Sequence, residues 1–436
     1  MRKPEAAASS GRALLCYEIG VIHSRSLRLL PAGAADAKKK NAPSSFEGLS
    51  MHSSTRPRRR LLIVGIHNAS EGYPNVRYRL DFLRAQPDLE VQEINIPLCN
   101  EDVRRKPVWG MVRLALRALI VHSALLVRLI QLPKADLAYV PYPAPSVLLL
   151  LACLPRWKAP GRVLADIFIS LYDTAVIDRR LSRPDSIAAR LLFWLEQCAC
   201  RKADHLIVDT INNASYLSRL FQLPADKISA IPLSTNEVDY QHIPYHPEPK
   251  RIKVLFIGTL IPLHGVGTII EAAAHLRSRD NFEFLLIGDG QTAPEVEHLL
   301  AIHKPNLIWQ RTWQTPRQLA AAIAEADICL GIFGDTAKAQ RVCPYKLYAY
   351  ASIGRAIITA RSAWLNSISG ISPDAVFATV KPADPEALAN EIVALADNPA
   401  RRSELAIASR RFYETTLSNA VAHRQLKVCL EEIFKA

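Results

Sequence analysis

Short, unbroken apolar runs recur along the chain, and most of them end at glycine or aspartate. A strand buried on both faces of a parallel sheet has this pattern. Helix-length amphipathic segments separate the runs, as in repeated β-α-β units. The runs occupy 61–65, 137–140, 163–166 and 205–209 in the first half, and 254–258, 284–288, 328–331 and 356–359 in the second. They predict an α/β protein with two Rossmann-like, doubly wound sheets.

A proline-rich connector at 243–249 separates the two series of runs. Proline stiffens a linker and marks a domain boundary, and a chain of 436 residues is too long for one hydrophobic core. We expect an N-terminal domain at 59–245, completed by a C-terminal helix at 415–436, and a second domain at 246–414. The two domains would face a central cleft at the carboxyl ends of their strands.

The basic character of the chain is concentrated in an N-terminal extension, residues 1–58. Residues 1–60 carry 12 Lys or Arg and 4 Asp or Glu, so +8 of the net charge of +13 lies there. This uneven charge argues against a nucleic-acid-binding fold. We expect the extension to be disordered. A secretory signal, a true start at Met51 and a contact with anionic lipid are the alternatives.

Eight cysteines are scattered along the chain, and the closest pair, Cys198 and Cys200, lacks the two-residue spacer of zinc and redox motifs. We therefore expect no metal and no disulfides. Reduced thiols indicate a cytoplasmic protein.

The segment 107–132 is apolar but contains Arg113, Arg117 and Arg128, which is too much charge for a comfortable transmembrane helix. Its apolar residues fall on one broad helical face. The segment is either a helix at the membrane surface, with Trp109 near its start, or a core helix packed against a sheet.

Two glycine-containing loops follow predicted strands of the second half. Gly288-Asp289-Gly290 would let a phosphate or ribose approach the backbone, although a glycine-rich turn without a ligand has the same pattern. The loop 258–265 precedes a helix, so its amides would point at an anion. His264 would either bind a phosphate or only cap that helix.

A long polar loop at 331–346 follows a third strand and carries Lys338, Arg341 and Lys346. Three cations suit a diphosphate, and loops of this length are commonly functional. A solvated surface would leave the interleaved glycine, proline and aromatic residues unexplained.

Five ordered segments resemble the family 4 glycosyltransferases of the GT-B fold. They are GTLIPLHG (258–265), LLIGDG (285–290), the long segment 326–359, DIFISLYDTAVIDR (166–179) and ADHLIVDT (203–210). The resemblance covers about residues 60–430. It implies transfer of a sugar from a nucleotide diphosphate sugar with retention at the anomeric carbon and without a metal. On this basis the expected donor site comprises Gly258, Thr259, His264, Gly265, Gly288, Asp289, Gly290, Lys338, Arg341, Lys346 and Tyr348.

The chain departs from the family pattern at several of these positions. His264 and Thr259 stand where the family has a phosphate-binding lysine and an arginine, so Lys346 and Lys338 would supply positive charge. Arg341 and Ala349 stand at the positions of two glutamates that bracket the donor. Without a carboxylate at Ala349, either the ribose is held differently, with help from Tyr348, or activity is reduced.

In the first half, the resemblance places the acceptor and the reacting end of the donor after the first strand and near 166–179. The expected catalytic residues are His67, Asp166 and Asp173, and the expected acceptor contacts are Gly72, Arg77, Ser170 and Tyr172. Carboxylates here, including Asp209, would orient an acceptor hydroxyl. For Asp178-Arg179 a local ion pair is an equal alternative.

The sequence thus predicts a hexosyltransferase that uses a nucleotide-sugar donor, a glycan or lipid-linked acceptor of the cell envelope, and no cofactor. It would work in the cytoplasm, with a peripheral contact at the inner face of the membrane. The alternatives are a nucleotide-sugar epimerase or hydrolase on the same fold, and a catalytically degenerate family member.

Overall fold

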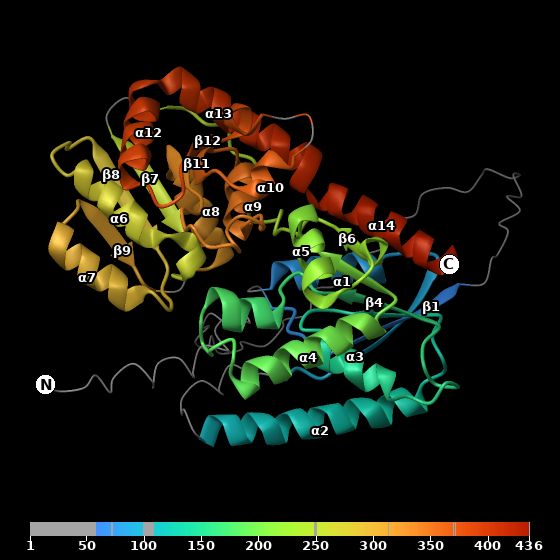
Figure 1. Ribbon diagram of the computed structural model, residues 1–436. Helices are drawn as coiled ribbons and strands as arrows, with labels where there is room; N and C mark the ends of the chain where they lie inside the picture. The colour runs from blue at the N-terminus through green and yellow to red at the C-terminus, as the bar shows by residue number, and fades with distance from the viewer. Residues whose placement is uncertain are drawn as a thin grey trace, which may run out of the picture.

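The computed structural model describes residues 58–70, 73–98, 109–247, 251–312, 314–368, 370 and 372–435. Figure 1 shows two lobes, one for each series of apolar runs, with the C-terminal helix α14 running from one lobe onto the other. The expected N-terminal extension lies outside the described residues except for Arg58.

The N-terminal domain contains a six-stranded sheet in which every neighbouring pair is parallel, in the order β2-β1-β3-β4-β5-β6. Its elements in chain order are β1 (Arg59–Gly65), α1 (Pro74–Arg84), β2 (Leu89–Asn95), α2 (Trp109–Gln131), β3 (Leu137–Val140), α3 (Pro145–Ala152), β4 (Arg162–Asp166), the π-helical turn η3 (Asp173–Asp178), α4 (Ile187–Lys202), β5 (His205–Val208), α5 (Ile211–Phe221), η4 (Ala225–Lys227) and β6 (Ile228–Ala230).

The C-terminal domain contains a second six-stranded parallel sheet, in the order β12-β11-β10-β7-β8-β9. Its elements are β7 (Ile252–Ile257), η5 (Pro262–His264), α6 (Val266–His275), β8 (Phe282–Ile287), α7 (Ala293–His303), β9 (Leu307–Gln310), α8 (Pro316–Glu325), β10 (Ile328–Leu330), α9 (Tyr345–Ile353), β11 (Ala356–Ala360), α10 (Ala363–Asn366), α11 (Pro373–Val376), β12 (Ala378–Val380), α12 (Pro385–Asp397), α13 (Pro399–Phe412), η6 (Tyr413–Leu417) and α14 (Asn419–Lys435).

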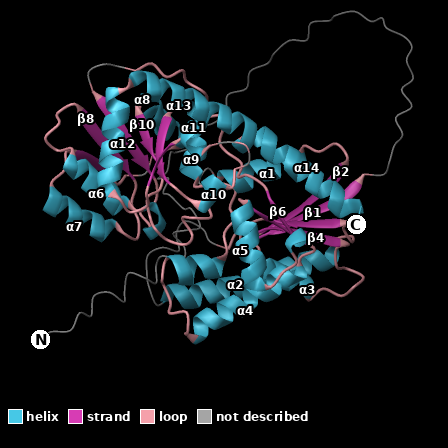
Figure 2. Ribbon diagram, turned by 45° about the horizontal axis from the view of Figure 1, so that its top comes forward, coloured by secondary structure: helices cyan, strands magenta, loops and turns pink. Residues whose placement is uncertain are grey.

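Both sheets are doubly wound, which confirms the predicted fold class. The chain reverses direction across the sheet between β1 and β3 and again between β7 and β10. Helices cover both faces of each sheet (Figure 2), and all residues of β3 and β11, which lie inside the sheets, are buried. A crevice forms outside the carboxyl ends of the strands at each reversal point.

Helix α14 packs on the sheet of the N-terminal domain, although it follows the C-terminal domain in sequence. Its apolar face, which includes Leu426 and Leu430, joins a core cluster with Leu61 and Ile63 of β1 and Leu80 of α1. The chain therefore passes between the domains twice, once before β7 and once at η6, and both passages hold the domains face to face.

Candidate functional site

A cleft of about 420 Å³ lies between the domains at the carboxyl ends of the strands. The C-terminal domain contributes the loop after β7, including Gly258, and the first residues of α9. The N-terminal domain contributes an aromatic wall of Tyr73, Tyr142 and Phe168. A largely apolar cleft with a few polar groups is the common form of a small-molecule site.

Lys346 places its amino group in this cleft. The side chain is buried, and within the described part of the chain no carboxylate pairs with it; its nearest charge-stabilising contact is the Phe256 ring, whose centre lies 4.7 Å from Nζ. Burial lowers the pKa of Lys346 well below its usual value. Lys346 lies in the first turn of α9, where backbone N–H groups have no partner in the helix and the dipole favours an anion.

Gly258 allows the loop after β7 to approach this lysine. A Cβ atom at position 258 would lie 3.0 Å from Nζ of Lys346 and 3.2 Å from Cε1 of His264. Any larger residue would fill the space in front of the ammonium group. The glycine therefore keeps the cation and the imidazole next to each other at the cleft wall.

His264 is buried and neutral. Its Nδ1 donates to the carbonyl oxygen of Thr259, and the residue at the start of α6 is Gly265, with φ at +61°. The imidazole therefore does not cap the helix. Burial, and then the nearby Lys346 cation, lower the pKa of His264 well below its usual value. With Nδ1 protonated, Nε2 carries the lone pair and faces no described hydrogen-bond partner.

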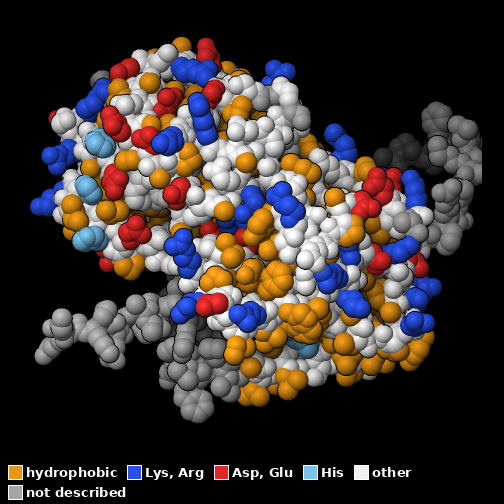
Figure 3. Space-filling model, viewed as in Figure 1, with side chains coloured by type: hydrophobic (Ala, Val, Ile, Leu, Met, Phe, Trp, Pro, Cys, Tyr) orange, Lys and Arg blue, Asp and Glu red, His pale blue; other side chains and the backbone are white. Residues whose placement is uncertain are grey.

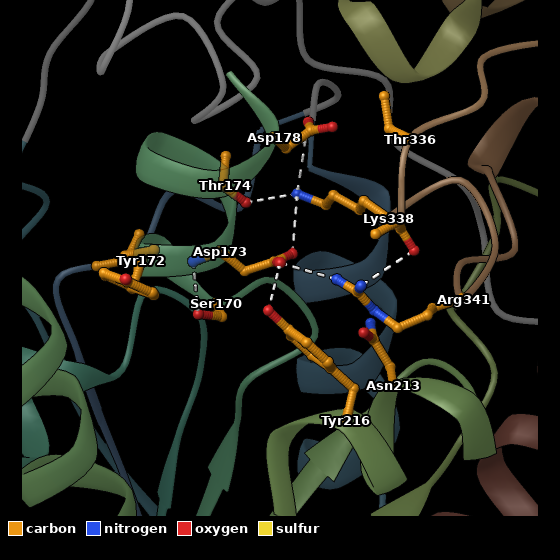
Figure 4. A network of polar contacts seen from close by, with 12 residues as sticks. Ser170, Tyr172, Asp173, Thr174, Asp178, Asn213, Tyr216, Thr336, Lys338 and Arg341 are labelled. Carbon is orange, nitrogen blue, oxygen red and sulfur yellow. Dashed lines mark hydrogen bonds and ion pairs between the residues drawn. The ribbon is translucent and has the colours of Figure 1, made fainter. Parts of the chain in front are cut away.

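Arg341 of the C-terminal domain contacts side chains of the N-terminal domain in a network of polar contacts (Figure 4). Its Nη2 lies 2.8 Å from Oδ1 of Asp173, and its guanidinium lies 3.5 Å from the centre of the Tyr216 ring. The Tyr216 hydroxyl donates to the same Asp173 oxygen over 2.9 Å. In addition, the Thr210 hydroxyl donates to the carbonyl oxygen of Arg341 over 2.6 Å. The two domains are thus joined through a buried ion pair.

Lys338 extends the same network. Its ammonium donates to the Thr174 hydroxyl over 2.5 Å and lies 3.9 Å from Asp173 and 4.0 Å from Asp178. Neither oxygen of Asp178 accepts a hydrogen bond from the described residues. Burial raises the pKa of Asp178, and the Lys338 cation opposes that shift. The network therefore contains two cations that an anionic ligand could attract away from carboxylates.

Glu196 holds the segment that carries Asp173, a role that sequence reasoning missed. Its buried carboxyl group accepts hydrogen bonds from the Ser170 hydroxyl over 2.9 Å and from the backbone N–H groups of Leu171 and Tyr172 over 2.8 Å each. Burial raises its pKa to about 7, against the effect of these bonds. Glu196 is the one acidic residue of α4 and directly follows the apolar run Leu191–Leu195, which is the signal that could have identified it.

Two of the expected catalytic residues do not reach the cleft. His67 is buried and its Nε2 faces Glu93 of β2 at 3.8 Å, while burial lowers its pKa to about 4. Asp166 is buried against Arg79 of α1, which pairs with its Oδ2. Arg79 also donates to the carbonyl oxygens of Ile231 and Pro232 over 3.0 Å each. In these positions His67 and Asp166 contact other residues of the N-terminal domain and do not face the cleft.

The remaining expected residues divide by position. Thr259 lines the cleft together with Gly258, His264, Lys338 and Lys346. Asp289 instead pairs with Arg311 at the surface, 3.0 Å away. Those that pack behind the cleft wall or face elsewhere are Gly265, Gly288, Gly290, Tyr348, Arg77, Ser170 and Tyr172. Gly72 lies outside the described residues.

Asp209 is a further carboxyl group in the cleft, at the end of β5. The Asn213 side-chain amide donates to its Oδ1 over 2.7 Å. Burial raises its pKa to about 6, against the hydrogen bond from Asn213. Among the residues that the structure describes, no three His, Cys, Asp or Glu side chains cluster as a metal site would require.

Residues 251–398 match the family model described as glycosyl transferases group 1. No curated protein sequence matches the chain.

Solved structures share the fold over most of the chain. Sucrose-phosphate synthase from Thermosynechococcus elongatus has a TM-score of 0.67 at 15% identity, covering 87% of this chain and 100% of that one. HepE of Anabaena, in complex with UDP-glucose, has a TM-score of 0.60 at 12% identity, covering 86% of this chain and 99% of that one. TarM of S. aureus, in complex with fondaparinux, alpha-GlcNAc-glycerol and UDP, has a TM-score of 0.53 at 13% identity, covering 72% and 59%.

Two facing parallel sheets with a cleft at their carboxyl ends define a GT-B protein. Residues 251–398 match the family model of the group 1 glycosyltransferases, in agreement with the glycosyltransferase that the sequence predicts.

Proposed function

We propose that this glycosyltransferase moves a hexose from a nucleotide diphosphate sugar to a hydroxyl group of a lipid-linked or cell-envelope glycan, with retention at the anomeric carbon. The observation that carries this proposal is the buried amino group of Lys346 beside the N-terminus of α9, with which no carboxylate of the described residues pairs. A bound diphosphate would pair with the amino group of Lys346 and would accept hydrogen bonds from the backbone N–H groups at the N-terminus of α9. HepE, which has the same fold, is solved with UDP-glucose.

The diphosphate gains negative charge as its bond to the sugar breaks, so the site must supply positive charge. Lys346 is placed to do so directly. Lys338 can turn toward the diphosphate from its carboxylate partners, which lie at 3.9 and 4.0 Å. Asp209 lies in the same cleft and is a suitable group to orient the acceptor hydroxyl. The proposed reaction uses no cofactor besides the donor.

Asp173 compensates for the missing glutamate at position 341. The N-terminal domain brings this carboxylate within 2.8 Å of the Arg341 guanidinium, so a negative charge lies next to the position where the resemblance implies a glutamate, but it comes from the opposite domain. We propose that Asp173 acts at the sugar end of the donor.

A second candidate is a catalytically degenerate member that binds the donor without transferring it. Ala349 favours this reading, because it lines the cleft at the position of the second family glutamate and offers no ribose acceptor. The third candidate is a nucleotide-sugar epimerase or hydrolase. The three candidate functions differ in whether the donor binds and in which products form.

Isothermal titration calorimetry with UDP-, GDP- and ADP-sugars tests donor binding, and mass analysis of products with and without a glycan acceptor tests transfer. The proposal predicts binding of one nucleotide class, with acceptor-dependent product whose anomeric configuration, read by NMR, matches the donor. Donor binding without product formation would favour the catalytically degenerate member. Hydrolysis or isomerisation without an acceptor would favour the third candidate. No binding at all would refute the enzymatic proposals together.

We also place the reaction in the cytoplasm, at the inner face of the membrane. Six cysteines of the described part are free thiols, in keeping with a reducing compartment. Fractionation of cells that express the protein tests this placement.

Donor binding is expected to take up protons. The pKa values of Lys346 and His264 are both lowered in the empty cleft, and a bound diphosphate favours the protonated forms. Net proton uptake follows, and affinity rises as the pH falls toward the lowered pKa values. Calorimetry at pH 8 in Tris and in HEPES measures the uptake through the different ionisation enthalpies of the buffers. Equal binding enthalpies would contradict it.

A further inference from the structure

Helix α2 lies along the outside of the N-terminal domain, at the bottom of Figure 1. Val121, Leu125 and Leu129 form its buried stripe and pack into the core under β2 and α3. The opposite face is also apolar. It consists of Leu116, Leu119, Ile120, Val127 and Ile130, and the exposed fractions of Leu119 and Ile120 are 66% and 67%.

The helix has the length and composition of a membrane span, but its packing shows another arrangement. Within the described residues, Arg113–Gln131 is the one segment long and apolar enough to cross a bilayer, with a mean hydropathy of 1.6. The buried stripe fixes the helix along the domain. A spanning orientation would have to expose Leu125 and break this core, so the helix lies on a surface.

Positive charge lines one edge of the exposed apolar face. Arg113, Arg117 and Arg128 all project from the same flank of the helix at its 3.6-residue period, and the sequence of α2 contains no Asp or Glu. Arg113 and Arg128 pair with no carboxylate of the described residues. Arg117 donates to the carbonyl oxygen of Pro97 over 3.1 Å.

Aromatic and apolar residues of neighbouring elements extend this face. Lys158 donates to the carbonyl oxygen of Leu132, which places Trp157, 67% exposed, beside the C-terminal end of α2. Helix α4 runs alongside α2 in both ribbon views, with Ile187, Leu191 and Trp194 exposed at helical spacing. Figure 3 shows hydrophobic side chains gathered over this part of the molecule.

We propose that this face docks on a bilayer containing anionic lipid, with α2 parallel to the membrane plane. The occupant follows from the combination of groups: apolar side chains enter the acyl boundary, arginines at the edge meet anionic headgroups, and tryptophan lies at the interface. The docking is independent of the donor site. It would hold the cleft next to a lipid-linked acceptor.

Co-sedimentation of the full chain with vesicles tests the proposal without any donor. The chain is expected to bind vesicles of phosphatidylglycerol and phosphatidylcholine in equal amounts, and to bind phosphatidylcholine alone weakly. Replacing Leu119 and Ile120 with glutamate is expected to reduce the partition coefficient roughly tenfold or more. Replacing Arg113 and Arg128 with glutamine is expected to reduce it about 30-fold, and added salt should weaken wild-type binding.

The matched control is Ile407→Glu, which changes an isoleucine of α13 that is 72% exposed on the other domain. Its partition should equal that of wild type. Circular dichroism and donor titration verify that each variant is folded, so a loss of partition is not a loss of structure. Wild-type-like partition of the α2 variants would overturn the proposal. So would a dimer in analytical ultracentrifugation without lipid that Leu119→Glu and Ile120→Glu dissociate, because the face would then bind a second copy.

Discussion

Replacing Lys346 with methionine is expected to weaken nucleotide-sugar binding by roughly a hundredfold or more. A charge-assisted hydrogen bond to a phosphate, made in a buried site, contributes up to about 3 kcal/mol. Lys346 lines this cleft, and no carboxylate of the described residues pairs with its amino group. Methionine keeps most of the volume and the apolar contacts and removes the charge. Calorimetric titration with the nucleotide sugar that binds wild type measures the loss.

The same substitution is expected to stabilise the empty protein, by about 1 kcal/mol or more, because a buried amine without a partner is costly. Affinity and stability should therefore move in opposite directions, whereas a folding defect would lower both. Chemical unfolding without ligand provides the second measurement. The control Lys427→Met removes an exposed lysine of α14 and should change neither. Unaltered donor affinity in Lys346→Met would show that the diphosphate is bound elsewhere.

The sequence was most informative about the central strands of the two sheets. The eight predicted apolar runs correspond to the strands β1, β3, β4, β5, β7, β8, β10 and β11. The strands that the pattern did not predict are β2, β6, β9 and β12, and these are the four edge strands. An edge strand is partly exposed, so it does not show a continuous apolar run, as the mixed burial of β9 illustrates. The prediction therefore missed strands because their residues are partly exposed.

Position after a strand was a weaker guide to the site. It correctly pointed at the neighbourhood of the cleft, where Lys346, His264 and Gly258 lie. Position after a strand could not predict which neighbouring residue forms an ion pair with a given side chain. Asp166 also follows a strand, yet Arg79 of α1 holds it in a buried pair. Such pairings depend on how a helix packs over the strand end, which periodicity alone does not determine.

The contact between Arg341 and Asp173 was beyond sequence reasoning for a related reason. The two residues are separated by 168 positions and belong to different domains. Read alone, Arg341 is a departure from the family pattern. Only the facing arrangement of the domains shows that a carboxylate meets it, with Tyr216 contacting both partners.

Replacing Asp173 with asparagine is expected to lower the free energy of unfolding of the empty protein by about 3 kcal/mol, because removing one partner leaves a buried charge uncompensated. Arg341 and Lys338 would then have Asp178 as their remaining partner within the described network. Added donor should restore part of this stability, because its diphosphate supplies negative charge to the freed cations. Urea unfolding with and without nucleotide sugar measures both effects.

A double-mutant cycle separates the ion pair from other consequences of the change. Arg341→Met should also destabilise, but the double variant Asp173→Asn with Arg341→Met should be destabilised by about 2 kcal/mol less than the sum of the single effects, because both charges are then absent. The matched control is the exposed pair of Arg401 and Glu404 on α13, 3.3 Å apart, whose coupling should stay below about 0.5 kcal/mol. Strict additivity at 173 and 341 would mean that the pair does not hold the domains together. The expected non-additivity, reduced by donor, would mean that donor binding and domain contact compete for the same cations.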